Sequence, residues 1–242
     1  MRYYGRIAET KVNWKFRFPE TEHYLRKYVT DRTAEESEDT IAVSDQEYSD
    51  WESFGNTIDA FAEFCLLCEQ TSEFLLLKDR CIIHAVALAM GGYSWLIAAG
   101  SGVGKSTLCR TLVEKYPQEI QVINGDKPAL ECAEKQRVIV HPSPWNGKEG
   151  WQGAQKAPLA GIFLLRRSDK TEIEAASESE AAVRLYLSIF QSFSDEAVIR
   201  ASGKMTEALL KAVPVWNLLS NHPSNAAELI YCKMQEVQNH EL

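Results

Sequence analysis

The sequence predicts an α/β fold in which helices flank one mixed, mostly buried β-sheet, with a small strand-containing lobe in front of it. Two observations lead to this prediction. From about residue 76 onward, short apolar runs rich in valine and isoleucine alternate with longer segments whose apolar residues recur at helical spacing. Before that point, apolar and polar residues alternate as they do in half-buried strands. We therefore expect an N-terminal lobe over residues 1–75 and a larger domain over residues 76–242.

The N-terminal lobe is expected to contain short strands and one helix. The strand segments are "YYGRI", "NWKFRF" and "TIAVS". A helix is expected from about Thr57 to Gln70. Its apolar face carries Ile58, Phe61, Cys65 and Cys68. The polar, acidic residues 31–40, "DRTAEESEDT", predict a solvated loop, with an acidic docking patch as the alternative.

The larger domain alternates strands with helices. The expected strands are "CIIHAVALAM", "YSWLIAA", "IQVIN", "PALEC", "RVIVH", "LAGIFLLRR", "TEIEAAS" and "VPVWNLL". The expected helices are "KSTLCRTLVEKY", "EAAVRLYLSIFQSF", "DEAVIRASGKMTEALLKAV" and "PSNAAELIYCKMQEVQ". Gly91 and Gly92 predict a hairpin turn between the first two strands.

Composition and charge exclude several classes of protein. The net charge of −8 over 242 residues argues against a general nucleic-acid binder, because such a protein needs a basic surface. No apolar stretch reaches the roughly 18 residues that cross a bilayer. The first residues, "MRYYGRIAET", lack the apolar core of a signal peptide. We expect a cytoplasmic protein that binds neither membrane nor nucleic acid.

The six cysteines are expected to be reduced thiols, because no secretion signal accompanies them. Cys65 and Cys68 form "CLLC", a spacing that metal and redox sites also use. They fall on the apolar face of the expected helix, and neither a second C-x-x-C nor a paired-histidine motif follows. Core packing is therefore the favoured interpretation.

The strongest motif is "LIAAGSGVGKSTLCR", which leads from a strand through a glycine-rich turn into a helix. Phosphate-binding loops follow the pattern G-x-x-x-x-G-K-[ST], and here Ala99 stands at the first glycine. Alanine is small, so it would matter only if that position required a positive φ. The expected phosphate-binding residues are Gly100, Ser101, Gly102, Val103, Gly104, Lys105, Ser106 and Thr107.

Each part of such a loop has a chemical role. Backbone N–H groups at a helix N-terminus bind phosphate oxygens, and the helix dipole favours negative charge there. Lys105 would reach the β- and γ-phosphates of ATP, and the Ser106 hydroxyl would bind Mg²⁺. The alternative is a glycine-rich turn with a chance Lys-Ser pair. That alternative does not account for the order of strand, loop and helix.

Two further residues could complete this site. Asp126 in "VINGDKPAL" follows the next buried strand, where a carboxylate can hold Mg²⁺ directly or through water. The alternative is a turn aspartate, since Asn, Gly, Asp and Pro all favour turns. His84 lies inside an apolar strand, which is typical of a core histidine. That strand leads by a hairpin into the loop strand, so His84 could also lie beside the γ-phosphate.

Two loop regions carry candidate binding residues. Residues 141–150, "HPSPWNGKEG", hold Trp145, Lys148 and Glu149. They could form a wall for substrate or nucleotide, or a surface loop anchored by a buried tryptophan. Arg166 and Arg167 end the strand "LAGIFLLRR" and could stabilise a transferring phosphate, although a solvated strand end explains them equally.

Taken together, these features resemble the catalytic domain of HPr kinase/phosphorylase, within the phosphoenolpyruvate carboxykinase-like group of phosphate-loop proteins. The resembling stretch covers about residues 81–130 and continues more weakly to about residue 167. The sequence is most similar to the compact HPr-kinase-like proteins, some of which are associated with ribosomally made peptide clusters. Their pattern is matched here by His84, "SGVGKST", "NGDKP", "PWNGK" and "PLAGI".

The resemblance implies an ATP-dependent kinase that acts on a serine-type hydroxyl of a protein or peptide. It implies that Lys105 holds phosphate and that Ser106 holds the metal. It also implies that Asp126 holds metal or acts near the nucleophile, while His84 supports the acidic site from the adjacent strand. A homo-oligomer is left open, because HPr kinase forms oligomers.

The sequence departs from that family at two places. Adjacent acidic residues end the strand in HPr kinase, whereas here the pair is Gly125 and Asp126. Either Asp126 has both roles, or the base comes from elsewhere in the chain, or phosphoryl transfer is weak. Glu149 is a candidate for the missing carboxylate and for a metal ligand. The Arg-Gly segment tied to the phosphorylase reaction is not found, so neither the reverse reaction nor HPr as substrate is expected.

Three functions can be compared with these residues. The first is a kinase that transfers the γ-phosphoryl group of ATP to a hydroxyl. The second is a nucleotide-binding regulatory or accessory protein without transfer activity, which the missing second carboxylate favours. The third, a carboxykinase acting on a small oxo-acid, lacks an evident set of substrate-binding arginines.

Overall fold

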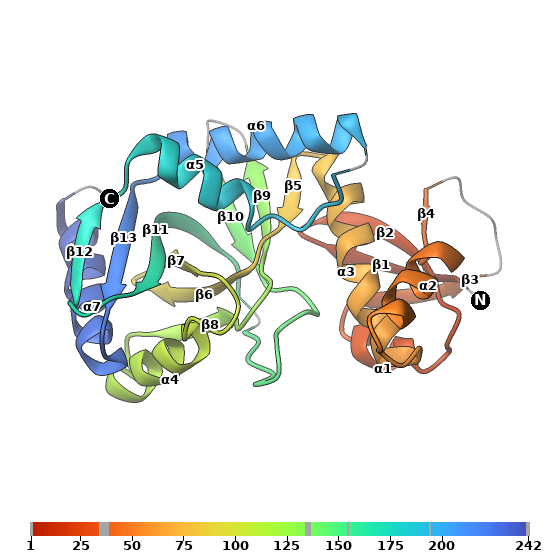
Figure 1. The fold of residues 1–242 in the computed structure, drawn as a ribbon, viewed down its shortest axis with the longest axis horizontal. Helices are drawn as coiled ribbons and strands as arrows, with labels where there is room; N and C mark the ends of the chain where they lie inside the picture. Colours follow the sequence, from red (N-terminus) through yellow and green to blue (C-terminus); the bar gives the residue numbers. More distant parts are fainter. Residues whose placement is uncertain (1, 34–38, 134–136, 154, 194, 241–242) are drawn as a thin grey trace.

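Two β-sheets organise the chain in this computed structural model, which describes residues 2–33, 39–133, 137–153, 155–193 and 195–240 (Figure 1). The smaller sheet lies at the N-terminal end of the molecule, and the larger sheet extends to the opposite end, near the C-terminus. Helices and mixed strands confirm the α/β class that the sequence predicts.

The smaller sheet has the strand order β3-β1-β2-β4. Its strands are β1 (Arg2–Ile7), β2 (Thr10–Lys15), β3 (Val29–Thr33) and β4 (Thr40–Ile41). β1 and β2 form an antiparallel hairpin whose turn residues, Ala8 and Glu9, are both in the left-handed region, with φ of 45° and 63°. Three helices accompany this sheet: α1 (Thr21–Leu25), α2 (Asp45–Ser53) and α3 (Ala60–Leu76).

The predicted acidic loop is partly wrong. Asp31, Arg32 and Thr33 belong to β3, because the backbone of β1 pairs with them in antiparallel register. The Arg32 guanidinium also donates to the Glu22 carboxylate at 3.0 Å, which compensates the local negative charge. Residues 34–38 of the predicted loop lie outside the described residues.

The predicted helix at 57–70 is shifted, because it begins after Asp59 and runs to Leu76. The Asp59 side chain caps it by accepting a hydrogen bond from the Ala62 N–H at 2.8 Å. Ile58 therefore lies outside the helix, and Phe61 is exposed rather than buried. The buried face includes Phe64, Leu67, Cys68, Thr71, Ser72 and Leu75. Cys68 packs in the hydrophobic core, and burial raises the pKa of its thiol, as expected for a structural cysteine.

The buried side chain of Glu63, on α3, connects several segments of the small lobe by hydrogen bonds. It is only 1% exposed, and its carboxylate accepts four hydrogen bonds. The donors are the backbone N–H groups of Arg17 and Phe18 and the hydroxyls of Thr21 and Tyr48, at 2.6, 3.1, 2.5 and 2.7 Å. A buried carboxylate is tolerated only with such a set of donors.

The larger sheet contains nine strands among the described residues. They are β5 (Arg80–Ile82), β6 (Ala85–Met90), β7 (Tyr93–Ala98), β8 (Gln121–Asn124), β9 (Ala129–Ala133), β10 (Arg137–His141), β11 (Ala157–Arg167), β12 (Glu172–Ala175) and β13 (Val215–Ser220). The order is β5-β9-β10-β11-β7-β6-β8, and β13 pairs with both β11 and β12. The predicted hairpin is confirmed, with Gly91 and Gly92 both in the left-handed region between β6 and β7.

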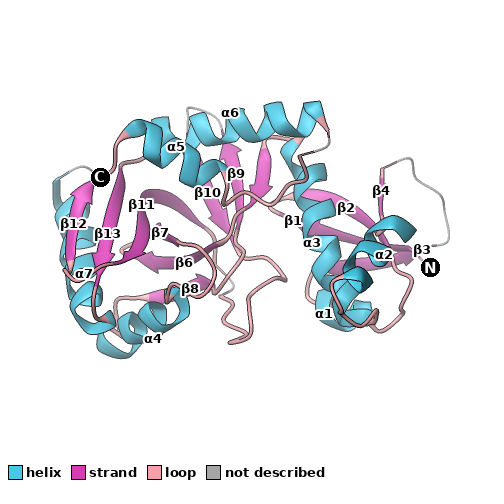
Figure 2. Ribbon diagram, viewed as in Figure 1, coloured by secondary structure: helices cyan, strands magenta, loops and turns pink. Residues whose placement is uncertain are grey.

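Helices cover both faces of the larger sheet (Figure 2). α4 (Lys105–Lys115) and α7 (Pro223–His240) pack on one face, and α5 (Glu178–Tyr186) and α6 (Glu196–Ala212) pack on the other. Alternate residues of β6 and β7 point into the two resulting cores, which explains why these strands are apolar throughout. Among the described residues, no helix is long and apolar enough to cross a membrane.

One predicted strand and one predicted helix are shorter in the structure than the sequence indicated, and the same backbone contacts explain both differences. The expected strand at residues 81–90 breaks at His84, since β5 pairs with β9 whereas β6 pairs with β7 and β8. The expected helix "EAAVRLYLSIFQSF" stops at Tyr186. The segment after it lies beside the break: the His84 N–H donates to the Ser188 carbonyl at 2.7 Å, and the Phe190 N–H donates to the Ile82 carbonyl at 2.9 Å. Pairing across the chain therefore overrides both local patterns.

Replacing Glu63 by glutamine should destabilise the protein, because an amide NH₂ would face donors that now meet carboxylate oxygens. We expect a loss of about 1–3 kcal/mol in the free energy of unfolding, measured by urea denaturation. Glu52→Gln, at an exposed position of α2, is the matched control and should change stability by less than about 0.5 kcal/mol. Equal stability of the two variants would contradict the role given to Glu63.

Candidate active site

The glycine-rich loop joins β7 to α4, and two of its glycines have backbone conformations that other residues rarely adopt. Gly102 and Gly104 are in the left-handed region, with φ of 73° and 120°, and Gly104 is the residue at which α4 begins. A Cβ on either glycine would meet open space, so the positive φ rather than crowding favours glycine at these two positions. Ala99 is buried and is not in the left-handed region, so alanine is accommodated without strain.

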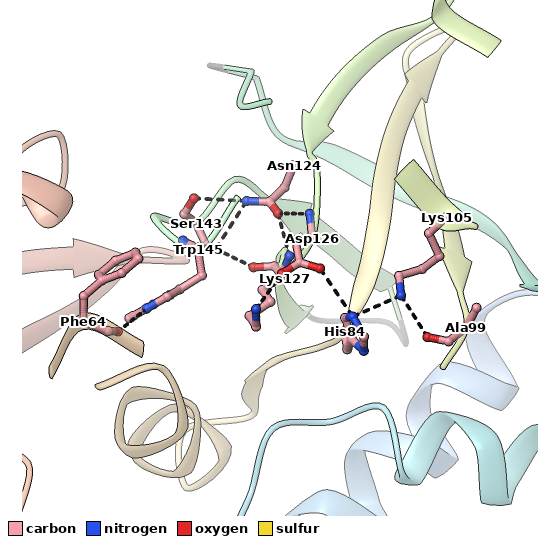
Figure 3. Close-up of polar contacts among 9 residues, drawn as sticks. All are labelled: Phe64, His84, Ala99, Lys105, Asn124, Asp126, Lys127, Ser143 and Trp145. Carbon is pink, nitrogen blue, oxygen red and sulfur yellow. Dashed lines mark hydrogen bonds and ion pairs between the residues drawn. The ribbon is translucent and has the colours of Figure 1, made fainter. Parts of the chain in front are cut away.

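Lys105 folds back over this loop. Its side chain is 7% exposed, and its Nζ donates to the Ala99 carbonyl at 2.9 Å. The same Nζ lies 3.0 Å from His84 Nε2. Burial lowers the pKa of Lys105, while the nearby Asp126 charge opposes that shift. The ammonium is thus held at the mouth of the loop, facing the strand break (Figure 3).

His84 stands between Lys105 and Asp126. Its Nε2 lies 3.3 Å from Asp126 Oδ1, so one ring nitrogen faces both an ammonium and a carboxylate. With a proton on Nε2 the ring donates to Asp126, and without that proton it accepts from Lys105. Burial by itself would raise the pKa of Asp126, but the hydrogen bonds from His84 and Lys127 lower it to about 2. Asp126 is therefore ionised at neutral pH.

A buried amide fixes the turn that carries Asp126. Asn124 Oδ1 accepts from the backbone N–H groups of Asp126 and Lys127 at 3.0 and 2.8 Å, and its Nδ2 donates to the Ser143 carbonyl at 3.0 Å. Sequence reasoning did not single out these supporting residues. The signal was present in "NGDKP", because an Asn side chain commonly closes a turn on the backbone two residues on.

Gly125 has a steric reason to lack a side chain. A Cβ there would lie 2.8 Å from the Asn146 carbonyl oxygen and 3.1 Å from Trp151 Cβ. Gly125 is not in the left-handed region, so space rather than backbone conformation excludes a side chain. The loop after β10 fills the place where a second carboxylate would project. Its Gly147, with φ of 77°, sits against Asp126, where a Cβ would be 2.9 Å from Asp126 Cβ.

The predicted metal ligands Ser106 and Glu149 have different surroundings. Ser106 lies exposed in the first turn of α4, beside Lys105, whereas the Glu149 carboxylate binds the Arg110 guanidinium at 2.9 Å. Arg110 also lies over the Trp151 ring at 5.7 Å. Within the described residues, no group of three or more His, Cys, Asp or Glu side chains is arranged to hold a metal. Mg²⁺ commonly binds through one or two carboxylates together with substrate phosphates, so the metal roles of Ser106, Asp126 and Glu149 stay predictions.

Trp145 is a structural anchor. It is 3% exposed, its Nε1 donates to the Phe64 carbonyl at 2.7 Å, and its ring stacks on the Phe64 ring with centroids 5.6 Å apart. Of the two interpretations that the sequence left open, the structure favours the buried anchor over a substrate wall. Lys148 is exposed on the same loop.

The two arginines at the end of β11 have different partners. Arg167 Nη2 donates to the Gly102 carbonyl at 2.7 Å, so it stabilises the backbone of the glycine-rich loop. Arg166 pairs with Glu180 at 2.9 Å. A cavity of about 520 Å³ lies beside them. Its lining includes Val103, Gly104, Thr107, Arg166, Arg167 and Asn221. Ser101 and Thr107 are exposed at the two ends of the loop.

Comparison with known proteins adds little to this geometry. No protein-family model matches the sequence, and no curated protein sequence matches it. Among solved structures, the chain is similar to the Hpr(Ser) kinase/phosphatase from Coxiella burnetii, with a TM-score of 0.36 and 13% sequence identity. That similarity covers 65% of this chain and 98% of the other. The function is therefore argued from the site itself.

The stability of the protein should depend on Asp126 at acid pH. Its pKa in the folded state, about 2, is below its usual 3.8, so its stabilising effect is present above about pH 4 and is lost as pH falls toward 2. The shift corresponds to about 2 kcal/mol. The free energy of unfolding should fall less steeply over this range in Asp126→Asn than in the wild type, and Asp169→Asn, at an exposed position, is the control. Parallel pH profiles for wild type and Asp126→Asn would contradict this account.

Gly125→Ala should destabilise the protein by about 1–3 kcal/mol, because the added methyl group meets the Asn146 carbonyl. Gly203→Ala is the control, since a Cβ there meets nothing within 4 Å and the residue lies inside α6. That control should be neutral or stabilising by up to about 1 kcal/mol. Both are measured by urea denaturation. A neutral Gly125→Ala would mean that the loop gives way and that crowding does not explain the glycine.

Proposed function

We propose that the protein is an ATP-dependent phosphotransferase of the HPr-kinase-like type, which transfers the γ-phosphoryl group of ATP to a serine-type hydroxyl of a protein or peptide. One observation carries the proposal. Lys105 of α4, His84 of the break between β5 and β6, and Asp126 of the turn after β8 form a continuous polar chain, with contacts of 3.0 and 3.3 Å, beside the glycine-rich loop. A structural ion pair would not need that loop beside it.

ATP would occupy the loop and the space next to it. The N–H groups of residues 100–107 would bind the β- and γ-phosphates, and Lys105 would exchange its bond to the Ala99 carbonyl for a phosphate oxygen. The cavity of about 520 Å³ borders Gly104 and Thr107, which makes it the natural place for the nucleoside. Arg167 would keep the loop in its binding conformation through the Gly102 carbonyl.

Mg²⁺ would be held by Ser106 and Asp126 together with the phosphates and water. A bound Mg²⁺ would neutralise the charge that builds up on the phosphates during transfer. Glu149 remains a candidate ligand only if its bond to Arg110 opens.

Asp126 would orient the acceptor and take its proton. The acceptor oxygen attacks the γ-phosphorus, the bond between that phosphorus and the bridging oxygen of ADP breaks, and the hydroxyl proton passes to the Asp126 carboxylate. A carboxylate with a pKa of about 2 is a weak base, so orientation of the hydroxyl is its larger contribution. His84 would hold Asp126 in place through Nε2, which also lies next to the Lys105 ammonium.

The alternative is a nucleotide-binding regulatory or accessory protein without transfer. Two observations favour it: the crowding that excludes a side chain at Gly125, and the occupation of both Asp126 oxygens by His84 and Lys127. Under either function we propose that residues 76–242 form the nucleotide-binding domain and residues 1–75 a separate lobe. A homo-oligomer fits both functions.

Lys105→Ala should abolish phosphoryl transfer while leaving the fold intact, because it removes the charge that holds the β- and γ-phosphates. Intact-mass spectrometry after incubation with Mg-ATP and proteins or peptides encoded beside the gene measures the product. Lys115→Ala, at the far end of the same helix, is the matched control and should retain activity.

Gain of one phosphate on a partner, lost in Lys105→Ala and in Asp126→Asn, would establish the kinase. Binding of ATP by the wild type with no phosphorylated product would instead support the regulatory alternative. Absence of ATP binding in a titration would refute both.

A further inference from the structure

Lys127 occupies an unusual place in the site. Its Nζ lies 2.5 Å from Asp126 Oδ2, the carboxylate oxygen that does not face His84 (Figure 3). The same ammonium lies 5.3 Å from the centre of the Phe190 ring, within the range of a cation–π contact. Both side chains are about three-quarters buried, with exposed fractions of 24% for Lys127 and 22% for Asp126. This ion pair is therefore partly shielded from solvent.

Around Asp126, the positively charged groups outnumber the carboxylates. The ammoniums of Lys105 and Lys127 approach it from opposite sides, the first through His84 and the second directly. Packing of the Asn146 carbonyl against Gly125 excludes a second carboxylate at the neighbouring position. A divalent cation that binds Asp126 must therefore share its carboxylate with an ammonium or displace that ammonium.

The backbone of Lys127 is held by hydrogen bonds, so a bound cation could move its side chain but not its backbone. Its backbone N–H donates to Asn124 Oδ1 at 2.8 Å, its carbonyl accepts from the Ser143 hydroxyl, and Pro128 follows it. The turn is thus fixed at both ends. Rotation of the flexible lysine stem can move the ammonium away from Asp126 without disturbing the carboxylate.

We propose that Lys127 is a positioning residue that serves as a tethered counter-ion for Asp126 and competes with the divalent cation for it. This inference rests on the proposed function, since it concerns the same site. Lys127 keeps the single carboxylate paired when no metal is bound, and it raises the concentration of Mg²⁺ needed before nucleotide binds productively. The opposite role, in which Lys127 orients Asp126 to help the metal bind, predicts the opposite sign.

The test is a Mg²⁺ titration of a fluorescent ATP analogue bound to wild type, Lys127→Met and Lys127→Arg. Loss of the competing ammonium should lower the Mg²⁺ concentration for half-maximal binding about three- to tenfold in Lys127→Met. Lys127→Arg keeps a cation and should stay within about twofold of wild type. Lys204→Met removes an exposed lysine from α6 and controls for the overall change in charge.

An unchanged or higher Mg²⁺ requirement in Lys127→Met would overturn the inference. An equal decrease in Lys204→Met would overturn it as well. If Lys127→Met fails to fold, judged by its unfolding midpoint, Lys127→Gln replaces it and is judged by the same criterion.

Failure of the proposed function gives a separate signature, because the wild type would then not bind the nucleotide at any Mg²⁺ concentration. Competition is in that case tested with Mn²⁺ alone, by measuring free Mn²⁺ through electron paramagnetic resonance. Tighter Mn²⁺ binding by Lys127→Met than by wild type, lost when Asp126→Asn is added, supports the inference. Equal Mn²⁺ binding by the two proteins overturns it.

Discussion

The arrangement of the site depends on the side chain of one fully buried residue, Asn124. Its amide oxygen binds the two backbone N–H groups that follow it in the turn, and its amide nitrogen binds the loop that returns after β10. A buried amide left without these partners would be costly, so the turn and the loop hold each other in place. Asp126 and Lys127 consequently project from a backbone that these hydrogen bonds hold in place. Their side chains form an ion pair although the two residues are adjacent in sequence.

The same constraint explains why the site has one carboxylate. The loop held by Asn124 lies so close to Gly125 that its Asn146 carbonyl and Trp151 fill the space of a side chain. An acidic residue at this position would require the loop to move, and the loop is anchored elsewhere by Trp145. The glycine is thus a packing requirement of this chain, and the chemistry must work with Asp126 and the cations around it.

Local patterns in the sequence were sufficient for much of the fold and for part of the site. The loop at residues 99–106 was predictable because strand, glycines, lysine and serine form one contiguous pattern, and its roles for nucleotide and metal stay predictions. The break at His84 was not predictable, because it arises from two different strand partners on either side of one residue. Lys127 was missed because a lysine in a turn is ordinarily solvated, and only the fixed turn directs it onto Asp126. Trp145 had two interpretations until its partner Phe64 was known to lie on α3.

The loop over residues 142–153 connects three parts of the molecule, and this connection gives the small lobe a physical link to the chemistry. Its contacts are Ser143 with Asn124, Trp145 with Phe64 of α3, Glu149 with Arg110 of α4, and Gln152 with Tyr28 of the small lobe. Any displacement of the small lobe would act on Trp145 and Gln152, and through the loop on the turn that carries Asp126. Since the Glu149–Arg110 pair is the most exposed of these contacts, it is the weakest point of the loop. Opening of this pair would release the α4 side of the loop first, and the turn that carries Asp126 would change only after the buried contacts to Asn124 and Phe64 had changed.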